Sequence, residues 1–205
     1  RFSEEKGKSI DPIVEEANER GITPLELSEI YTEKFLKDAK KLNILEQDVM
    51  PKASDHIQEI VEVIEVLLQK GFAYEADGNV YFKVEKFKTY GKLSGNTLDK
   101  MDQLLEAVRI SVETDKKDSA DFALWKKAED RIMSWDSPWG MGVPGWHIEC
   151  SVMAMKYLGI SLDIHLGGED LVFPHHEDEI AQSESFSGQK FVNYWMHTSF
   201  LTLED

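Results

Sequence analysis

The feature that most constrains the fold is the alternation of helix and strand patterns over the last third of the chain. Residues 146–158 have the pattern of a helix and 162–166 that of a short apolar strand. A second helix pattern starts at Pro174 and runs to about Ser185, and a further strand lies within 192–203. Alternating helices and strands with short links are typical of parallel sheets, in which helices cross over between strands. We therefore expect an α/β fold in which this part forms half of an open parallel sheet.

The first seventy residues carry helical patterns instead. A short helix is predicted over 12–21. The sequence TPLE at 23–26 is a capping box with proline at the first helical position, so a longer helix starts there. A third helix is predicted within 51–71, because its apolar residues recur at helical spacing and a glycine closes it. Ser54 or Asp55 is expected to cap it.

The middle of the chain has a different sequence pattern. Residues 72–84 alternate as strand, turn and strand around the sequence ADGN at 76–79. From 85 to 145 the sequence is rich in Lys, Asp, Gly and Trp and has few long periodic segments. We expect a packed, turn-rich and irregular insertion there. The chain is thus predicted to have three parts, 1–71, 72–145 and 146–205.

Composition and charge exclude several classes of protein. The 205 residues are 41% hydrophobic and 30% charged, which is ordinary for a soluble globular protein and unlike a disordered one. The formal net charge of −16 argues against nonspecific binding of nucleic acid, which requires a positive field. No apolar run could cross a bilayer, so no membrane association is expected. With one cysteine, Cys150, no internal disulfide can form, and we expect a cytoplasmic protein.

The stretch FPHHEDEIAQ at 173–182 contains a candidate metal site. His175 and Glu179 are four residues apart, so on a helix they share a face, and they suit zinc as nitrogen and oxygen ligands. His176 is expected to lie off this face and to make a hydrogen bond. Cys150 would supply a third ligand. A surface hydrogen bond between His175 and Glu179, and a buried core role for Cys150, are the alternatives. A zinc peptidase motif H-E-x-x-H is excluded, because Ile180 stands where the second histidine would be.

A second candidate site is the sequence HLGGED at 165–170. A strand that ends in glycines followed by an acid is how open α/β sheets present a carboxylate to a ribose. Gly168 and Asp170 would fill these positions. A structural turn is the alternative.

Several long stretches resemble one family. They are TYGKLS (89–94), DFALWK (121–126), GWHIECS (145–151), DIHLGGEDLVFPHHEDEIAQSE (163–184) and NYWMHTSF (193–200). Together they are similar to the catalytic core of cysteinyl-tRNA synthetase, a class I aminoacyl-tRNA synthetase. The resemblance covers nearly the whole chain.

The resemblance implies a Rossmann-type domain that activates cysteine with ATP and transfers it to tRNA(Cys). In the family, two cysteines, a histidine and a glutamate hold a zinc ion in the amino-acid pocket. By position these ligands are Cys150, His175 and Glu179, and the remaining cysteine belongs to a segment that precedes Arg1.

The resemblance also implies roles for four further residues. Trp146 and His165 are expected to line the cysteine pocket, and Gly168 and Asp170 to contact the ribose of ATP. No residue of the chain is assigned a catalytic role, because the family's HIGH and KMSKS motifs, which contact ATP, are expected outside residues 1–205.

The resemblance also implies a place in the family's catalytic region for each of the three predicted parts. Residues 1–71 would be the helical part of the catalytic core, 72–145 the connective insertion, and 146–205 the second half of the Rossmann-type core with the zinc site. We therefore expect a middle fragment of a catalytic region that does not catalyse adenylation alone. A monomer is expected.

Three other interpretations remain open. The ligase that joins cysteine to an amino sugar in mycothiol synthesis is a relative with a similar zinc pocket. A noncatalytic zinc-binding paralogue would keep the fold without the activity. An α/β domain without a metal is the third.

Overall fold

The structure is a computed structural model, and it describes residues 4–5, 8–9, 12–96, 100, 115–128 and 133–202. The chain divides into two compact units. One consists of residues 1–50 and 130–134, and the other of residues 51–129 and 135–205. Within the described residues, no helix is both long and apolar enough to span a bilayer.

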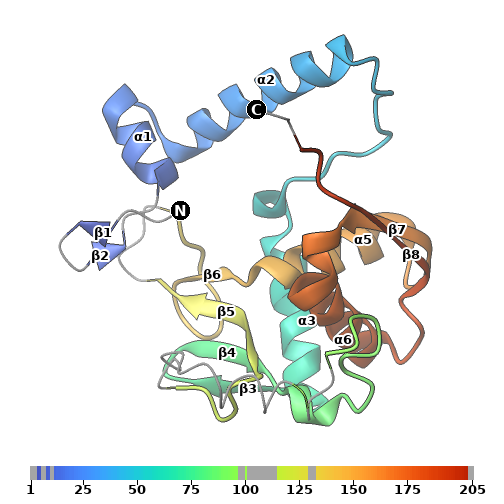
Figure 1. The fold of residues 1–205 in the computed structure, drawn as a ribbon. Helices are drawn as coiled ribbons and strands as arrows, with labels where there is room; N and C mark the ends of the chain where they lie inside the picture. The colour runs from blue at the N-terminus through green and yellow to red at the C-terminus, as the bar shows by residue number, and fades with distance from the viewer. Residues whose placement is uncertain are drawn as a thin grey trace. The chain divides into compact units, whose positions relative to one another are not determined.

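The first unit is built around two helices, α1 (Pro12–Arg20) and α2 (Pro24–Lys41) (Figure 1). The predicted capping box at the start of α2 is confirmed. The hydroxyl of Thr23 accepts a hydrogen bond from the Glu26 backbone N–H at 3.2 Å, and the Thr23 N–H donates to Glu26 Oε2 at 2.7 Å. Two short strands ahead of the helices form an antiparallel pair, β1 (Glu4–Glu5) and β2 (Lys8–Ser9).

The second unit begins with the predicted third helix, α3 (Ile57–Gln69). Its start differs from the prediction. Neither Ser54 nor Asp55 caps it, because both lie in a 3₁₀ turn (Ala53–Asp55), and His56 is the residue at the cap.

A four-stranded antiparallel sheet follows α3. The strand–turn–strand prediction for 72–84 is confirmed by the first two strands, whereas the prediction of an irregular 85–145 is wrong in part, since that region contains two further strands. The strands, in sheet order, are β3 (Ala73–Ala76), β4 (Asn79–Phe82), β5 (Phe122–Lys127) and β6 (Gly142–Pro144).

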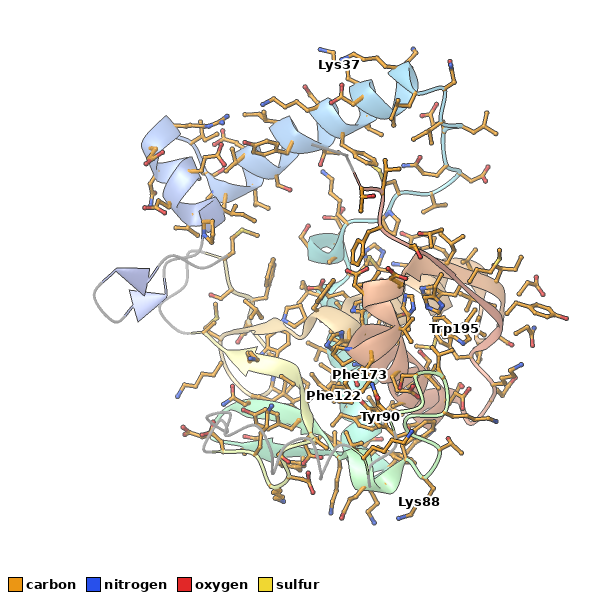
Figure 2. The ribbon with its side chains drawn as sticks, in the orientation of Figure 1. Lys37, Lys88, Tyr90, Phe122, Phe173 and Trp195 are labelled. Atoms are coloured by element: carbon orange, nitrogen blue, oxygen red, sulfur yellow. The ribbon has the colours of Figure 1, made fainter. Side chains whose placement is uncertain are left out.

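The core of this unit lies between α3, the sheet and the two later helices. Ile60, Ile64 and Leu67 of α3 are fully buried, as are Leu124 and Trp125 of β5. Figure 2 shows the side chains of this unit, with Phe122 of β5 and Phe173 labelled near its centre. The apolar spacing that predicted α3 is therefore the face that the helix buries.

The last third of the chain confirms the predicted α/β alternation. Strands β7 and β8 pair in parallel, with Leu162 opposite Val192 and Gly168 opposite Thr198. Parallel neighbours need a crossover, and α6 provides it. The elements are α5 (Trp146–Leu158), β7 (Leu162–Gly168), α6 (Glu177–Ser187) and β8 (Val192–Thr198).

One boundary in this region was predicted wrongly. The helix expected to open at Pro174 begins at Glu177, and Val172–His176 form a distorted helical turn. Phe173 has extended backbone angles (φ −141°, ψ 133°), because the ring of a following proline disfavours the helical conformation in the residue before it. The Phe173–Pro174 peptide bond is cis.

The sheet β5–β6 runs directly into α5. A single residue, Gly145, separates the last residue of β6 from the first of α5, and its N–H donates to the Leu124 carbonyl at 2.8 Å. A Cβ at Gly145 would lie 2.0 Å from the Ala123 carbonyl oxygen, so no larger residue fits there. The packing of the sheet therefore fixes where α5 begins.

Among the described residues of this unit, none covers one face of the β7–β8 pair, and that face is apolar. Its side chains are Ile164 and Leu166 on β7 and their register partners Tyr194 and Met196 on β8, which are 49–70% exposed. Parallel sheets usually have both faces covered.

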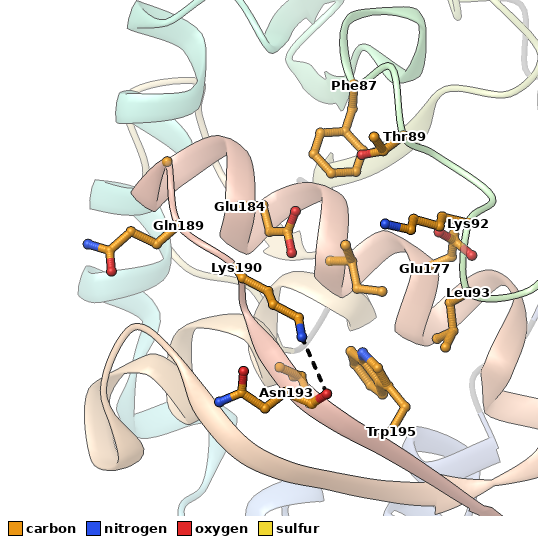
Figure 3. A pocket seen from close by; sticks show the side chains of 13 residues that line it. Phe87, Thr89, Lys92, Leu93, Glu177, Glu184, Gln189, Lys190, Asn193 and Trp195 are labelled. Atoms are coloured by element: carbon orange, nitrogen blue, oxygen red, sulfur yellow. Dashed lines mark hydrogen bonds between the residues drawn. The ribbon is translucent and has the colours of Figure 1, made fainter.

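A cavity of about 570 Å³ lies between residues 87–93, α6 and the start of β8 (Figure 3). It uses the face of α6 that carries Glu177, Ile180 and Glu184, and Lys190 Nζ donates to the Asn193 carbonyl at its rim at 3.4 Å. None of the predicted site residues lines this cavity.

Candidate metal centre

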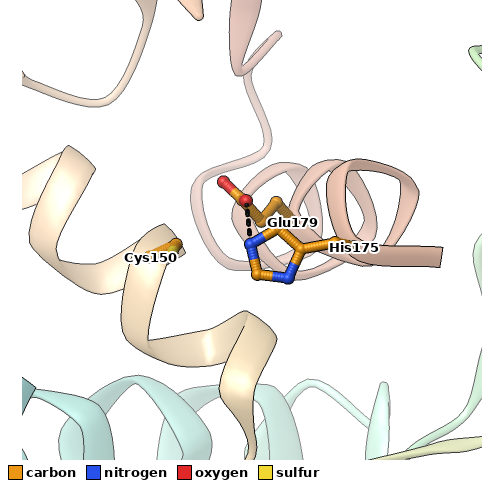
Figure 4. Close-up of side chains that lie close together, drawn as sticks. All are labelled: Cys150, His175 and Glu179. Carbon is orange, nitrogen blue, oxygen red and sulfur yellow. Dashed lines mark ion pairs between the residues drawn. The ribbon is translucent and has the colours of Figure 1, made fainter. Parts of the chain in front are cut away.

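Three predicted ligand residues from two helical segments come together. Cys150 lies on the second turn of α5, His175 in the turn before α6, and Glu179 on the first turn of α6 (Figure 4). Their ligand atoms all lie within 4.8 Å of one another, and His175 Nε2 is 3.0 Å from Glu179 Oε1. A sulfur, a nitrogen and an oxygen donor thus face one small volume.

The carboxylate of Glu179 is the part of this group that most needs a cation. The residue is fully buried, and within the described part of the chain neither of its oxygens has a hydrogen-bond partner of good geometry. A buried carboxylate without donors is costly unless a positive charge lies beside it. Zinc accepts thiolate, imidazole and carboxylate ligands, so these donors fit the ion that the resemblance implies.

A second donor group shares the same carboxylate. The ligand atoms of His165, His176 and Glu179 also lie within 4.8 Å of one another. We expected His176 to point away from the ligand face, which is wrong. It is buried beside His165 and Glu179, and its Nδ1 lies 2.8 Å from Nε2 of His197, so the hydrogen bond expected of it is present. The spacing of three between His176 and Glu179 would have indicated this, since i, i+3 residues also share a helix face.

Burial controls the protonation of the site. It lowers the pKa of His147 to about 4 and that of His176 to about 3, so both imidazoles are neutral near pH 7. Burial, with smaller contributions from Glu179 and Glu149, raises the pKa of the Cys150 thiol to about 12. Neutral imidazoles can donate a lone pair to a metal, whereas the thiol must lose its proton on binding one.

The two residues predicted to line a cysteine pocket flank the donors. The Trp146 ring lies 4.4 Å from the His175 ring, centroid to centroid, and the residue is 60% exposed. His165 Nδ1 lies 3.7 Å from Glu179 Oε2, and its ring stacks on that of Trp195 at 4.7 Å. An exposed tryptophan and a half-buried histidine therefore flank the ligand group.

The two predicted ribose contacts lie at the carboxyl end of β7. Gly168 is the last residue of the strand, and Asp170 follows in a 3₁₀ turn (Glu169–Leu171). A Cβ at Gly168 would lie 2.3 Å from Asp170 Oδ1, so the glycine makes room for this carboxylate. The carboxyl ends of parallel strands are where open α/β sheets bind ligands.

The sequence matches one family along almost its whole length. The family described as "tRNA synthetases class I (C) catalytic domain" matches residues 9–205. The chain belongs to this family. Its α/β content and parallel strand pair fit part of a class I synthetase catalytic domain.

Curated relatives of this synthetase domain are about half identical to it. A protein named "Cysteine--tRNA ligase" from Carboxydothermus hydrogenoformans is 52% identical over 193 residues, which are 94% of this chain and 41% of that protein. Proteins of the same name from Pelotomaculum thermopropionicum and Pyrococcus horikoshii are 52% and 48% identical, over 95% and 100% of this chain. They are covered to 40% and 44% of their own length, so the chain spans less than half of these relatives.

The synthetase domain also contains contacts that the sequence did not indicate. All three acids of the HHEDE stretch are buried. Glu177 accepts a hydrogen bond from the Ser94 backbone N–H at 2.9 Å, and Asp178 accepts one from the hydroxyl of Tyr90. The TYGKLS stretch is thus tied to the start of α6 by side chains more than 80 residues away, which no local pattern reveals.

Proposed function

We propose that the protein to which this chain belongs is a cysteine–tRNA ligase. It would activate cysteine with ATP and transfer it to tRNA(Cys), with a zinc ion selecting the cysteine thiolate. The observation that carries the proposal is that the donor atoms of Cys150, His175 and Glu179 converge, and that the buried Glu179 carboxylate has no hydrogen-bond partner of good geometry among the described residues. The chain also belongs to a family whose curated relatives are named cysteine–tRNA ligases. We also propose that this protein is cytoplasmic and monomeric and has no membrane partners.

The need for a metal follows from the selection problem. A hydrophobic pocket separates side chains of similar size by only about 1–3 kcal/mol, which is too little to reject serine or alanine. When bound, zinc would act as a Lewis acid that coordinates a thiolate more strongly than a neutral hydroxyl. Cys150, His175 and Glu179 would hold it, while Trp146 and His165 would enclose the amino acid beside it.

The nucleotide would lie at the carboxyl edge of β7. The Asp170 carboxylate is exposed and can accept hydrogen bonds from ribose hydroxyls, and Gly168 lets the ligand and this carboxylate approach the strand. Attack of the cysteine carboxylate on the α-phosphate needs positioning and stabilisation of negative charge rather than a proton donor. This is why no residue of the chain is proposed as a general acid or base.

The test compares three variants of the full-length protein. Cys150→Ser and His175→Gln should lose zinc and should activate cysteine and serine with similar efficiency. His56→Gln is a matched control, because His56 is also buried but lies by Tyr157, with Nε2 2.9 Å from the tyrosine oxygen, outside the donor group. Metal content and ATP–pyrophosphate exchange with each amino acid are measured. Undiminished cysteine preference in Cys150→Ser contradicts the proposal, and transfer to an amino sugar instead of tRNA supports the mycothiol ligase.

We also propose that the 205-residue chain is inactive by itself. It spans about 41% of a full-length relative, so most of that protein's residues are outside it. No ATP–pyrophosphate exchange above background is expected from the isolated chain. Exchange at the rate of the full-length protein would overturn this.

A further inference from the structure

A chain of four side chains, three of them buried (Tyr90, Asp178 and His175) and one half-buried (His147), connects the TYGKLS stretch to the candidate metal ligand His175. The hydroxyl of Tyr90 donates to Asp178 Oδ1. The other oxygen of Asp178, Oδ2, lies 3.3 Å from His147 Nε2, and His147 Nδ1 lies 2.7 Å from His175 Nδ1. His175 Nε2 then faces Cys150 and Glu179.

The hydrogen positions along this chain have one arrangement that leaves His175 able to bind a metal. If Nε2 of His175 gives its lone pair to a metal, Nδ1 of the neutral ring carries the hydrogen. His147 Nδ1 must then accept that hydrogen bond, so His147 carries its own hydrogen on Nε2. That nitrogen lies 3.3 Å from Oδ2 of Asp178, which can accept the hydrogen, while Oδ1 of Asp178 receives the Tyr90 hydroxyl. Each donor meets one acceptor, and no two hydrogens face each other.

We propose that Asp178 and Tyr90 are positioning residues that act through His147 to fix the tautomer of His175. This inference rests on the proposed zinc site, since it concerns the nitrogen that His175 turns toward Cys150 and Glu179. Groups that orient a metal-bound histidine through its other nitrogen determine its tautomer and strengthen metal binding. Asp178 is required as an acceptor, and Tyr90 holds that acceptor in place.

The surroundings of Tyr90 keep its hydroxyl in position. The residue is 5% exposed, and its ring stacks on that of Phe122 of β5 with centroids 6.5 Å apart (Figure 2). Four residues later the Ser94 N–H binds Glu177, the residue next to Asp178. The segment from Tyr90 to Ser94 is thus attached at two points to the first turn of α6.

The structure offers a matched pair for comparison. Tyr74 is 8% exposed, and its hydroxyl donates to the buried carboxylate of Asp121 at 2.7 Å, as that of Tyr90 does to Asp178. Asp121 does not connect Tyr74 to a candidate ligand, because its other oxygen accepts a hydrogen bond from the Val84 N–H at 3.0 Å. Removal of the Tyr90 hydroxyl takes one hydrogen bond from the fold, and removal of the Tyr74 hydroxyl takes two, because it also accepts from the Lys117 N–H at 2.8 Å. Only the loss at Tyr90 should reach the metal.

The experiment uses the full-length protein and zinc alone as the ligand. Zinc affinity is measured by competition with a chromogenic chelator for wild type, Asp178→Ala, Asp178→Asn, Tyr90→Phe and Tyr74→Phe, each checked for folding by its melting temperature. We expect Asp178→Ala to weaken binding about tenfold, at the low end of the 10–100-fold known for outer-shell partners. Asp178→Asn should stay close to wild type, because its amide oxygen can still accept from His147. Tyr90→Phe should weaken binding about threefold while Tyr74→Phe leaves it unchanged, although both lower the melting temperature.

A second readout follows the tautomer directly. Nitrogen-15 shifts of selectively labelled histidine in the zinc-loaded protein should assign the hydrogen of His175 to Nδ1 and that of His147 to Nε2. Equal zinc affinity of Tyr90→Phe and wild type overturns the inference, as does a His147 that carries its hydrogen on Nδ1. If Asp178→Ala does not fold, the two tyrosine variants and the nitrogen shifts still decide. A wild-type protein that binds zinc no better than Cys150→Ser rejects the proposed function instead.

Discussion

Two glycines near the site differ in what a methyl group would meet. At Gly145 a Cβ would press on the Ala123 backbone, which cannot move without disturbing β5. At Gly168 it would press on Asp170 Oδ1, the end of a side chain that can rotate away. The same substitution should therefore damage the fold at one position and the site at the other.

We predict that Gly145→Ala destabilises the protein by about 1–3 kcal/mol, the usual effect of overpacking. Gly168→Ala should leave stability within about 0.5 kcal/mol of wild type but displace the Asp170 carboxylate. In the full-length protein, KM for ATP should then rise in Gly168→Ala as it does in Asp170→Asn. Urea unfolding and exchange kinetics measure both effects. Unchanged KM in both variants at Gly168 and Asp170 would remove these residues from the nucleotide site.

At this scale the sequence predicted part of the site for a physical reason. The spacing of His175 and Glu179 is local, and a helix brings such residues to one face whatever surrounds it. Cys150 is on another helix, so no spacing indicated it; it was proposed because a thiolate suits zinc, and the family resemblance then assigned the same residue. Tyr90 and Ser94 could not be predicted, because their contacts depend on how distant segments pack.

Among the elements, α2 depends on its capping box. Replacement of Thr23 by alanine should destabilise the first unit by about 0.5–2 kcal/mol, the usual cost of losing a cap. Helix content by circular dichroism in increasing urea measures this.

The same cap predicts a dependence on pH. Hydrogen bonds from the Thr23 backbone and hydroxyl lower the pKa of Glu26 below its ordinary value of 4.5. The ionised form therefore favours the helix, and its contribution is present above pH 4.5 and is lost as pH falls through the lowered pKa. Glu26→Gln should be less stable than wild type at pH 7 and equal to it near pH 2. A constant difference between the two proteins across this range would contradict the assignment.

Predictions of elements succeeded where one face is buried at a regular period. The apolar positions of α3 recur at helical spacing, so its face was visible in the sequence. In β5, by contrast, the adjacent residues Leu124 and Trp125 are both buried, and β6 has only three residues, which include a glycine and a proline. Their strand conformation comes from pairing with β4 and with each other, which is a tertiary effect.

For the molecule as a whole, the uncovered face of β7–β8 should govern behaviour in solution. We predict that the isolated 205-residue chain, in contrast to the full-length protein proposed above to be monomeric, self-associates at micromolar concentration, because apolar side chains of both strands face water. Tyr194→Lys should reduce this association, whereas Asn193→Lys, which adds the same charge at a neighbouring exposed polar position, should not. Light scattering at increasing concentration measures it. A chain that stays monomeric without either substitution would show that this face is tolerated in water.

The junction at Gly145 has a mechanical consequence. With one residue between the last residue of β6 and the first of α5, there is no slack to absorb a rotation of the antiparallel sheet. A tilt of that sheet would rotate the start of α5, and the sulfur of Cys150 would move with it. A force that acts on the antiparallel sheet would therefore change the position of the thiol.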